Sequence, residues 1–130
     1  MRTLLLTLVL GTATGAGAQP LDPAPDLFRY YCSNCHGVDA DGEGPLARFL
    51  TVDVPDLTGL SARNGGVFPM LEVIHRMDGT REDLLHDSPM PDLNAVLMDE
   101  VPGFSDDTAV LMENRARILS IALYLEDLQN

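Results

Sequence analysis

Two cysteines, with a histidine directly after the second, are the residues of this chain best suited to chemistry. They lie in the segment Cys32-Ser33-Asn34-Cys35-His36. Residues three positions apart lie on the same side of a helical turn, so both thiols could reach one flat ligand. A Cys-x-x-Cys-His sequence is typical of a covalently attached c-type haem, in which the histidine becomes the proximal iron ligand. We therefore predict one covalent haem c, held by thioethers from Cys32 and Cys35 and ligated by His36.

Three other uses of a cysteine pair fit this sequence less well. A thioredoxin-like redox pair follows a strand within a βαβ pattern, and no such pattern surrounds the motif. A zinc site needs a second Cys-x-x-Cys or a His-x-x-x-His to complete it, and the chain has neither. A disulfide between the two cysteines would close a very short loop and would leave His36 without a role.

The other side of the iron could carry a second protein ligand or stay open. Met90 lies in Pro89-Met90-Pro91, a segment that cannot be helical at its centre and is expected to be extended. Met70 and Met77 are seven positions apart on one predicted helical face and favour a core role. Met98 lies in an apolar stretch and Met112 near the start of a predicted helix. We predict Met90 as the distal iron ligand.

Two histidines are alternatives to Met90. His75 lies beside the apolar stripe of a predicted helix and is expected to be partly exposed, while His86 lies four positions before Met90. Bis-histidine ligation would lower the reduction potential relative to a His/Met pair. An open sixth position would instead allow small molecules to bind the iron.

The beginning of the chain has the pattern of a secretory signal. Arg2 is followed by an apolar run over residues 4–10, and Ala16-Gly17-Ala18 is a typical cleavage sequence. The run is too short to span a bilayer. We expect residues 1–18 to be a cleaved signal peptide, residues 19–130 to form one haem domain, and the mature protein to be periplasmic without a membrane span.

The composition restricts the partners. The chain has 8 basic and 20 acidic residues, and loss of Arg2 with the signal would take its formal charge from −12 to −13. Nucleic acid and anionic membranes are poor partners for such a chain. It contains no lysine, so docking through a ring of lysines is excluded. Both cysteines would be consumed by thioethers, and no disulfide is expected.

Periodicity and turn residues predict about four short helices joined by long loops. The first starts near Asp22-Pro23 and runs into the haem motif. Residues 37–66 are rich in glycine, aspartate and proline, and indicate loops with one short helical turn at residues 46–50. Apolar spacing predicts helices at residues 67–77 and from Asp106 or Asp107 to about residue 128. We expect an all-α domain, with the loops packed on the haem.

This combination of features resembles the class I c-type cytochromes along the whole mature chain. The shared features are one Cys-x-x-Cys-His near the mature N-terminus, a proline-flanked methionine far downstream and a C-terminal amphipathic helix. The resemblance implies a cytochrome c fold in which the first and last helices cross beside one haem. It also places Ala24 and Phe28 against Ile121 and Tyr124.

The resemblance implies roles for two loop segments. Pro45, in Gly44-Pro45-Leu46, would offer the carbonyl that accepts a hydrogen bond from the second ring nitrogen of His36. Arg63 or Asn64 would lie near a haem propionate. Ordinary turn and surface roles are the alternatives for these residues.

The expected function is electron transfer by a periplasmic carrier that exchanges electrons with partner proteins the sequence does not identify. Such a protein turns over no substrate and is not an enzyme. One alternative is a dedicated haem subunit of a periplasmic dehydrogenase or reductase complex, with the apolar stretch at residues 94–104 as its interface. A second alternative is a gas- or peroxide-binding haem protein with an open sixth site.

Overall fold

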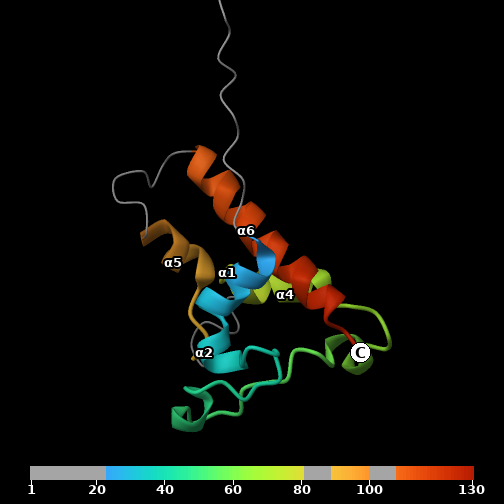
Figure 1. Ribbon diagram of the computed structural model, residues 1–130. Helices are drawn as coiled ribbons and strands as arrows, with labels where there is room; N and C mark the ends of the chain where they lie inside the picture. Colours follow the sequence, from blue (N-terminus) through green and yellow to red (C-terminus); the bar gives the residue numbers. More distant parts are fainter. Residues whose placement is uncertain (1–22, 81–88, 100–107) are drawn as a thin grey trace, which may run out of the picture.

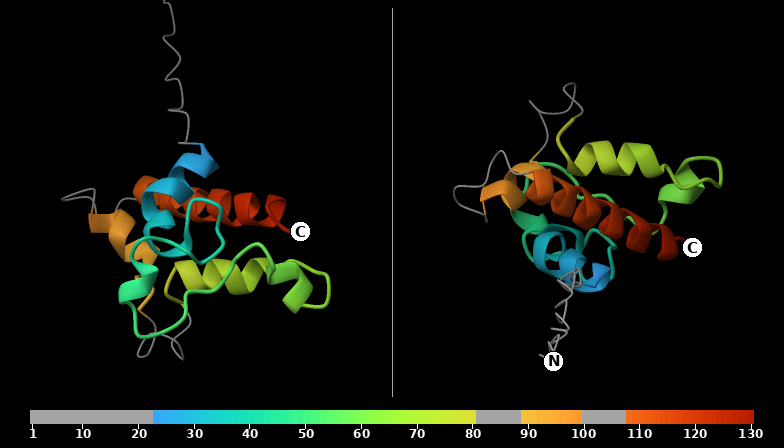
Figure 2. Two further views of the ribbon diagram at one scale, coloured as in Figure 1. Left: turned by 60° about the horizontal axis from the view of Figure 1, so that its bottom comes forward. Right: turned by 90° about the horizontal axis from the view of Figure 1, so that it is seen from above.

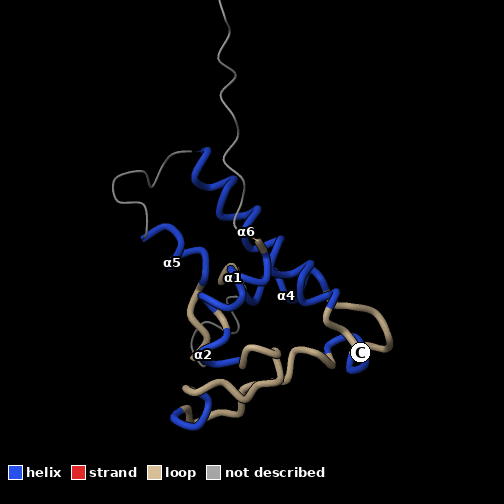
Figure 3. Tube along the Cα trace, in the orientation of Figure 1, coloured by secondary structure: helices blue, strands red, loops and turns tan. Residues whose placement is uncertain are grey.

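A long C-terminal helix forms the centre of the structure, which is a computed structural model describing residues 23–80, 89–99 and 108–130. This helix, α6 (Thr108–Asp127), contacts α1 (Ala24–Tyr31), α4 (Met70–Met77) and α5 (Leu93–Asp99). Figure 1 shows α1 crossing α6 and α5 alongside the first half of α6. The described residues contain no strand, so the all-α prediction is confirmed (Figure 3).

The shorter elements lie in the connection between α1 and α4. The helix α2 (Ser33–His36) follows α1 almost directly, and a 3-10 helix, η1 (Ala47–Phe49), and α3 (Leu60–Arg63) interrupt the loops that follow. In the left view of Figure 2, these teal-to-green loops run from the side of α1 and α6 round to α4. Within the described residues, no helix combines the length and apolar character needed to cross a membrane.

Within the described residues, the core is a cluster of apolar side chains from four helices and one loop residue. Phe28 is 1% exposed and Ile121 is fully buried, and the rings of Phe28 and Tyr124 lie 5.6 Å apart at an interplanar angle of 55°. The predicted packing of Phe28 near Ile121 and Tyr124 agrees with this arrangement. The buried members of the cluster are Leu27, Phe28, Ala40, Val73, Met77, Leu93, Leu97, Ile118, Ile121, Ala122 and Leu125.

Two helices were not predicted from the sequence. The segment at residues 94–104 was expected to be an apolar interface or loop, but its first part belongs to α5, whose Leu93 and Leu97 are buried. These two residues are four apart, a spacing that places both on the face toward α6. The helix α3 lies in the region expected to be loop apart from a turn at residues 46–50; that turn is present as η1. The predicted signal segment and His86 lie outside the described residues.

Candidate haem site

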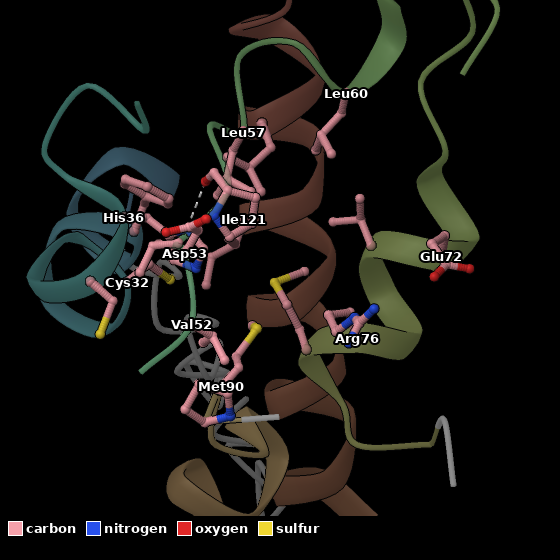
Figure 4. Close-up of a pocket in the computed structure, with 18 of the residues that line it drawn as sticks. Cys32, His36, Val52, Asp53, Leu57, Leu60, Glu72, Arg76, Met90 and Ile121 are labelled. Carbon is pink, nitrogen blue, oxygen red and sulfur yellow. Dashed lines mark hydrogen bonds between the residues drawn. The ribbon is translucent and has the colours of Figure 1, made fainter. Parts of the chain in front are cut away.

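A cavity of about 440 Å³ lies between α2, α4, α6 and the loops, within the range of about 300–1,000 Å³ usual for ligand pockets. It contains all four residues predicted to form the site: Cys32, Cys35, His36 and Met90. Figure 4 shows His36 and Met90 entering it from different segments of the chain. Its wall is mostly apolar and also includes Phe28, Leu50, Val52, Asp53, Val54, Pro55, Leu57, Leu60, Pro69, Glu72, Val73, Arg76, Met77, Pro89, Ile121 and Leu125.

The backbone holds the cysteine pair at one edge of the cavity. Cys32 lies between α1 and α2, where its N–H donates to the Phe28 carbonyl at 2.9 Å and its own carbonyl accepts from His36 N–H at 2.9 Å. The helical turn that carries the cysteines and His36 is therefore nearly continuous with α1. Because α1 packs on α6, the positions of both cysteines are tied to the core.

The loop after α2 binds the carbonyls at the end of that helix. Gly42 N–H donates to His36, Gly44 to Cys35 and Leu46 to Asn34, at 2.9, 3.1 and 2.8 Å. Helix ends leave such carbonyls without intrahelical partners, so this loop satisfies groups that would otherwise need water. The close approach requires a glycine at residue 44, since a Cβ there would lie 2.5 Å from backbone atoms of Asn34 and Cys35.

The His36 ring is oriented by a hydrogen bond to a backbone carbonyl, that of Pro55. Its Nδ1 lies 3.4 Å from the carbonyl oxygen of Pro55. A carbonyl only accepts, so Nδ1 carries the proton and Nε2 keeps a lone pair for a metal ion. Burial lowers the pKa of His36, and the hydrogen bond to Pro55 opposes this only in part. Burial therefore favours the neutral ring, which is the form that binds a metal ion.

The expected role of Pro45 is wrong in this structure, because Pro55 supplies the carbonyl. The residues on either side of Pro45, Gly44 and Leu46, direct their N–H groups to the backbone of α2. This holds the loop against the end of the helix rather than against the imidazole. The loop carrying Pro55 is anchored elsewhere, through Leu57 N–H to the Ala40 carbonyl at 2.7 Å.

Among the described residues, two methionine side chains line the cavity. Met90 is half-buried and follows Pro89, which also lines the wall. Met77, predicted as a core residue, is 3% exposed in the apolar cluster and lines the cavity as well. Met70, Met98 and Met112 do not line it, and neither does His75, which is exposed as predicted.

The environment of Cys32 differs from that of a redox-active thiol. Burial, with a smaller repulsion from Cys35, raises the pKa of Cys32 to about 12. A thioredoxin-like dithiol needs a cysteine with a lowered pKa, because the thiolate is the nucleophile. The described residues also hold no cluster of three or more His, Cys, Asp or Glu side chains that could bind a metal ion by themselves.

The charged residues of the cavity were not predicted from the sequence. Asp53, Glu72 and Arg76 line it, whereas Arg63 and Asn64 do not. Arg63 instead donates to the Asp56 carbonyl. A signal for Arg76 existed, because it is three positions from the apolar Val73 on the predicted helix and so lies near its buried face.

The donor set and the mostly apolar wall of the cavity fit a c-type haem. Two thiols stand at one edge, a neutral imidazole offers a lone pair, thioether sulfurs reach the same space and the walls are apolar. Comparisons of the chain with protein-family models, curated proteins and solved structures found no match.

Proposed function

We propose that this protein is a periplasmic electron carrier of the class I cytochrome c type, with one haem c linked to Cys32 and Cys35. His36 would be the proximal ligand and Met90 the distal ligand. When bound, the haem supplies an iron that accepts and releases one electron. The chain contributes an apolar pocket and two fixed ligands.

The proposal depends above all on one observation: the Cys-x-x-Cys-His motif and Met90, far apart in the sequence, line the same apolar cavity. An imidazole and a thioether are the axial pair of many cytochromes c, and they raise the reduction potential relative to two histidines. The Pro55 carbonyl fixes the ring of His36, so this ligand needs little rearrangement when the oxidation state changes.

A methionine in the cavity favours an electron carrier over a gas- or peroxide-binding protein. A carrier keeps both ligands, whereas a binding protein must leave the sixth position to an outside molecule. The role as a dedicated subunit of a larger complex loses part of its support, since Leu97 of the apolar stretch is buried and its helix, α5, packs on α6.

The attachment site is tested by producing the full chain, with its own signal, in a bacterium equipped for cytochrome c maturation. We expect the periplasmic product to have the mass of residues 19–130 plus one haem and to keep haem on a denaturing gel. The double variant Cys32→Ala/Cys35→Ala should lose covalent haem completely. Each single variant should retain at most one thioether.

Two results would contradict the proposal. A periplasmic product of unmodified polypeptide mass would refute haem attachment. Rapid binding of carbon monoxide by the reduced wild-type protein at neutral pH would refute electron transfer with two fixed ligands, and would support the gas-binding alternative.

A further inference from the structure

Arg76 is a half-buried cation without a partner among the described residues. It lies on α4, lines the cavity and has no ion pair or hydrogen bond to any residue that the structure describes. Arg29 and Arg117, in contrast, pair with carboxylates of their own helices at 3.0 and 2.7 Å. A guanidinium that is partly removed from water gains from an anion nearby.

The position of Arg76 indicates which edge of a bound ligand it would meet. Figure 4 shows Cys32 and Arg76 on opposite sides of the cavity, with Cys32 near α2 and Arg76 on α4. A haem carries its vinyl groups on one half of the ring and its two propionate carboxylates on the other. A haem bonded to the cysteines through its vinyl groups therefore directs its carboxylates away from them, toward the side where Arg76 lies.

We propose that Arg76 binds a propionate of the haem, an inference that rests on the proposed function. A guanidinium forms a two-pronged contact with a carboxylate that a point charge cannot reproduce. The other charged residues of the wall, Asp53 and Glu72, are acidic and would repel a propionate. Arg76 is the only arginine in the described wall, and the chain has no lysine to replace it.

The pairing has an electrostatic consequence for the iron. A propionate neutralised by Arg76 favours the ferric state less than a propionate whose charge is uncompensated. Removal of the guanidinium should therefore stabilise the ferric form and lower the reduction potential. This shift in reduction potential depends on the loss of a charge near the iron. Loss of a charge far from the iron should change the potential much less, so the two contributions can be measured separately.

The test compares the haem-loaded variants Arg76→Gln, Arg76→Lys and Arg115→Gln by redox titration at neutral pH. Arg115 is an exposed α6 residue outside the cavity, so Arg115→Gln removes the same charge at a distance. We expect Arg76→Gln to raise the ferric-to-ferrous ratio at a fixed applied potential by roughly threefold or more. Arg115→Gln should leave the ratio nearly unchanged, and Arg76→Lys, which keeps the charge without the two-pronged contact, should restore the wild-type value only in part.

A second measurement uses the wild-type protein and does not require any variant to fold. In the reduced, diamagnetic state, nuclear Overhauser effects should connect the side-chain protons of Arg76 with the methylene protons of one propionate. Their absence would overturn the inference, as would equal effects of Arg76→Gln and Arg115→Gln. Both outcomes presuppose a haem-loaded protein, whereas a wild-type product without haem would instead refute the proposed function.

Discussion

The ability of His36 to bind a metal ion depends on the surroundings of its ring. Its ring has one hydrogen-bond partner in the described structure, the Pro55 carbonyl, and its burial disfavours the charged imidazolium. Burial favours the neutral ring, while the hydrogen bond to Pro55 holds the proton on Nδ1 and leaves Nε2 available.

The presence of two methionines in the cavity makes the identity of the distal ligand testable with a matched pair of variants. Met90→Leu and Met77→Leu each remove a thioether while nearly preserving side-chain volume. We expect Met90→Leu to keep covalent haem, to lose the methionine-to-iron charge-transfer band of the ferric protein and to bind carbon monoxide when reduced. Met77→Leu should keep the band and cost less than about 1.5 kcal/mol of stability. If the band is lost only in Met77→Leu, the ligand assignment is wrong.

At the scale of elements, the haem motif is held from two directions. Its N-terminal side continues from α1, whose Phe28 is buried against α6. Its C-terminal side is bound by the loop at residues 42–46. The residues just after α6 stabilise the loop beyond Pro55, because the Gln129 side chain accepts from Ser61 N–H at 2.9 Å and donates to the Leu57 carbonyl at 2.9 Å.

Gly44 provides a test of the loop that binds α2. In Gly44→Ala the new methyl group would lie 2.5 Å from the backbone of Asn34 and Cys35, so helix or loop must move. We expect a loss of about 1–3 kcal/mol in the free energy of unfolding and a lower yield of haem-loaded protein. Denaturant titration and the ratio of haem to protein measure these effects.

Gly59→Ala is the matched control for Gly44→Ala. A Cβ at residue 59 would meet only the Arg63 side chain, whose guanidinium nitrogen is 2.8 Å away and can rotate aside. The backbone φ of Gly59 is −104°, a value open to alanine. This variant should change stability by less than about 1 kcal/mol. Equal losses of stability in the two variants would show that the close contact between the loop and α2 is not the reason why residue 44 must be glycine.

The whole molecule carries a strong negative charge, which would influence its encounter with a partner in the proposed electron transfer. The formal charge of the full chain is −12, and the eight arginines are the only basic residues besides three histidines. Such a field attracts cations and repels anions, and salt weakens both effects. A physiological partner is therefore expected to present a basic or nearly neutral surface.

Small redox reagents of opposite charge can measure this field without knowledge of the partner. At low ionic strength, a cationic metal complex should oxidise the reduced protein faster than expected from its driving force, and added salt should slow it by about tenfold. An anionic complex should show the opposite dependence. The measurement is stopped-flow absorption of the haem. Identical salt dependence for both reagents would show that the net charge does not control approach to the haem.

The sequence alone determined the features that depend on local spacing. The Cys-x-x-Cys-His motif and the apolar repeats of α4 and α6 predicted the helical class and the residues for haem attachment, because a helix places residues three and four apart on one face. The choice of Met90 in the Pro-Met-Pro segment was also local, because a residue before proline disfavours helical backbone angles and the segment was therefore expected to be extended.

Only the tertiary structure decided which distant groups meet. Pro45 and Pro55 are both prolines in loops, and local sequence offers no means to choose between them; the hydrogen bonds of Gly44 and Leu46 to α2 decide the matter. Arg76 and Met77 likewise reach the cavity because α4 packs on α6 beside the loops. Such contacts join residues far apart in the chain, and they depend on how whole elements pack rather than on any local pattern.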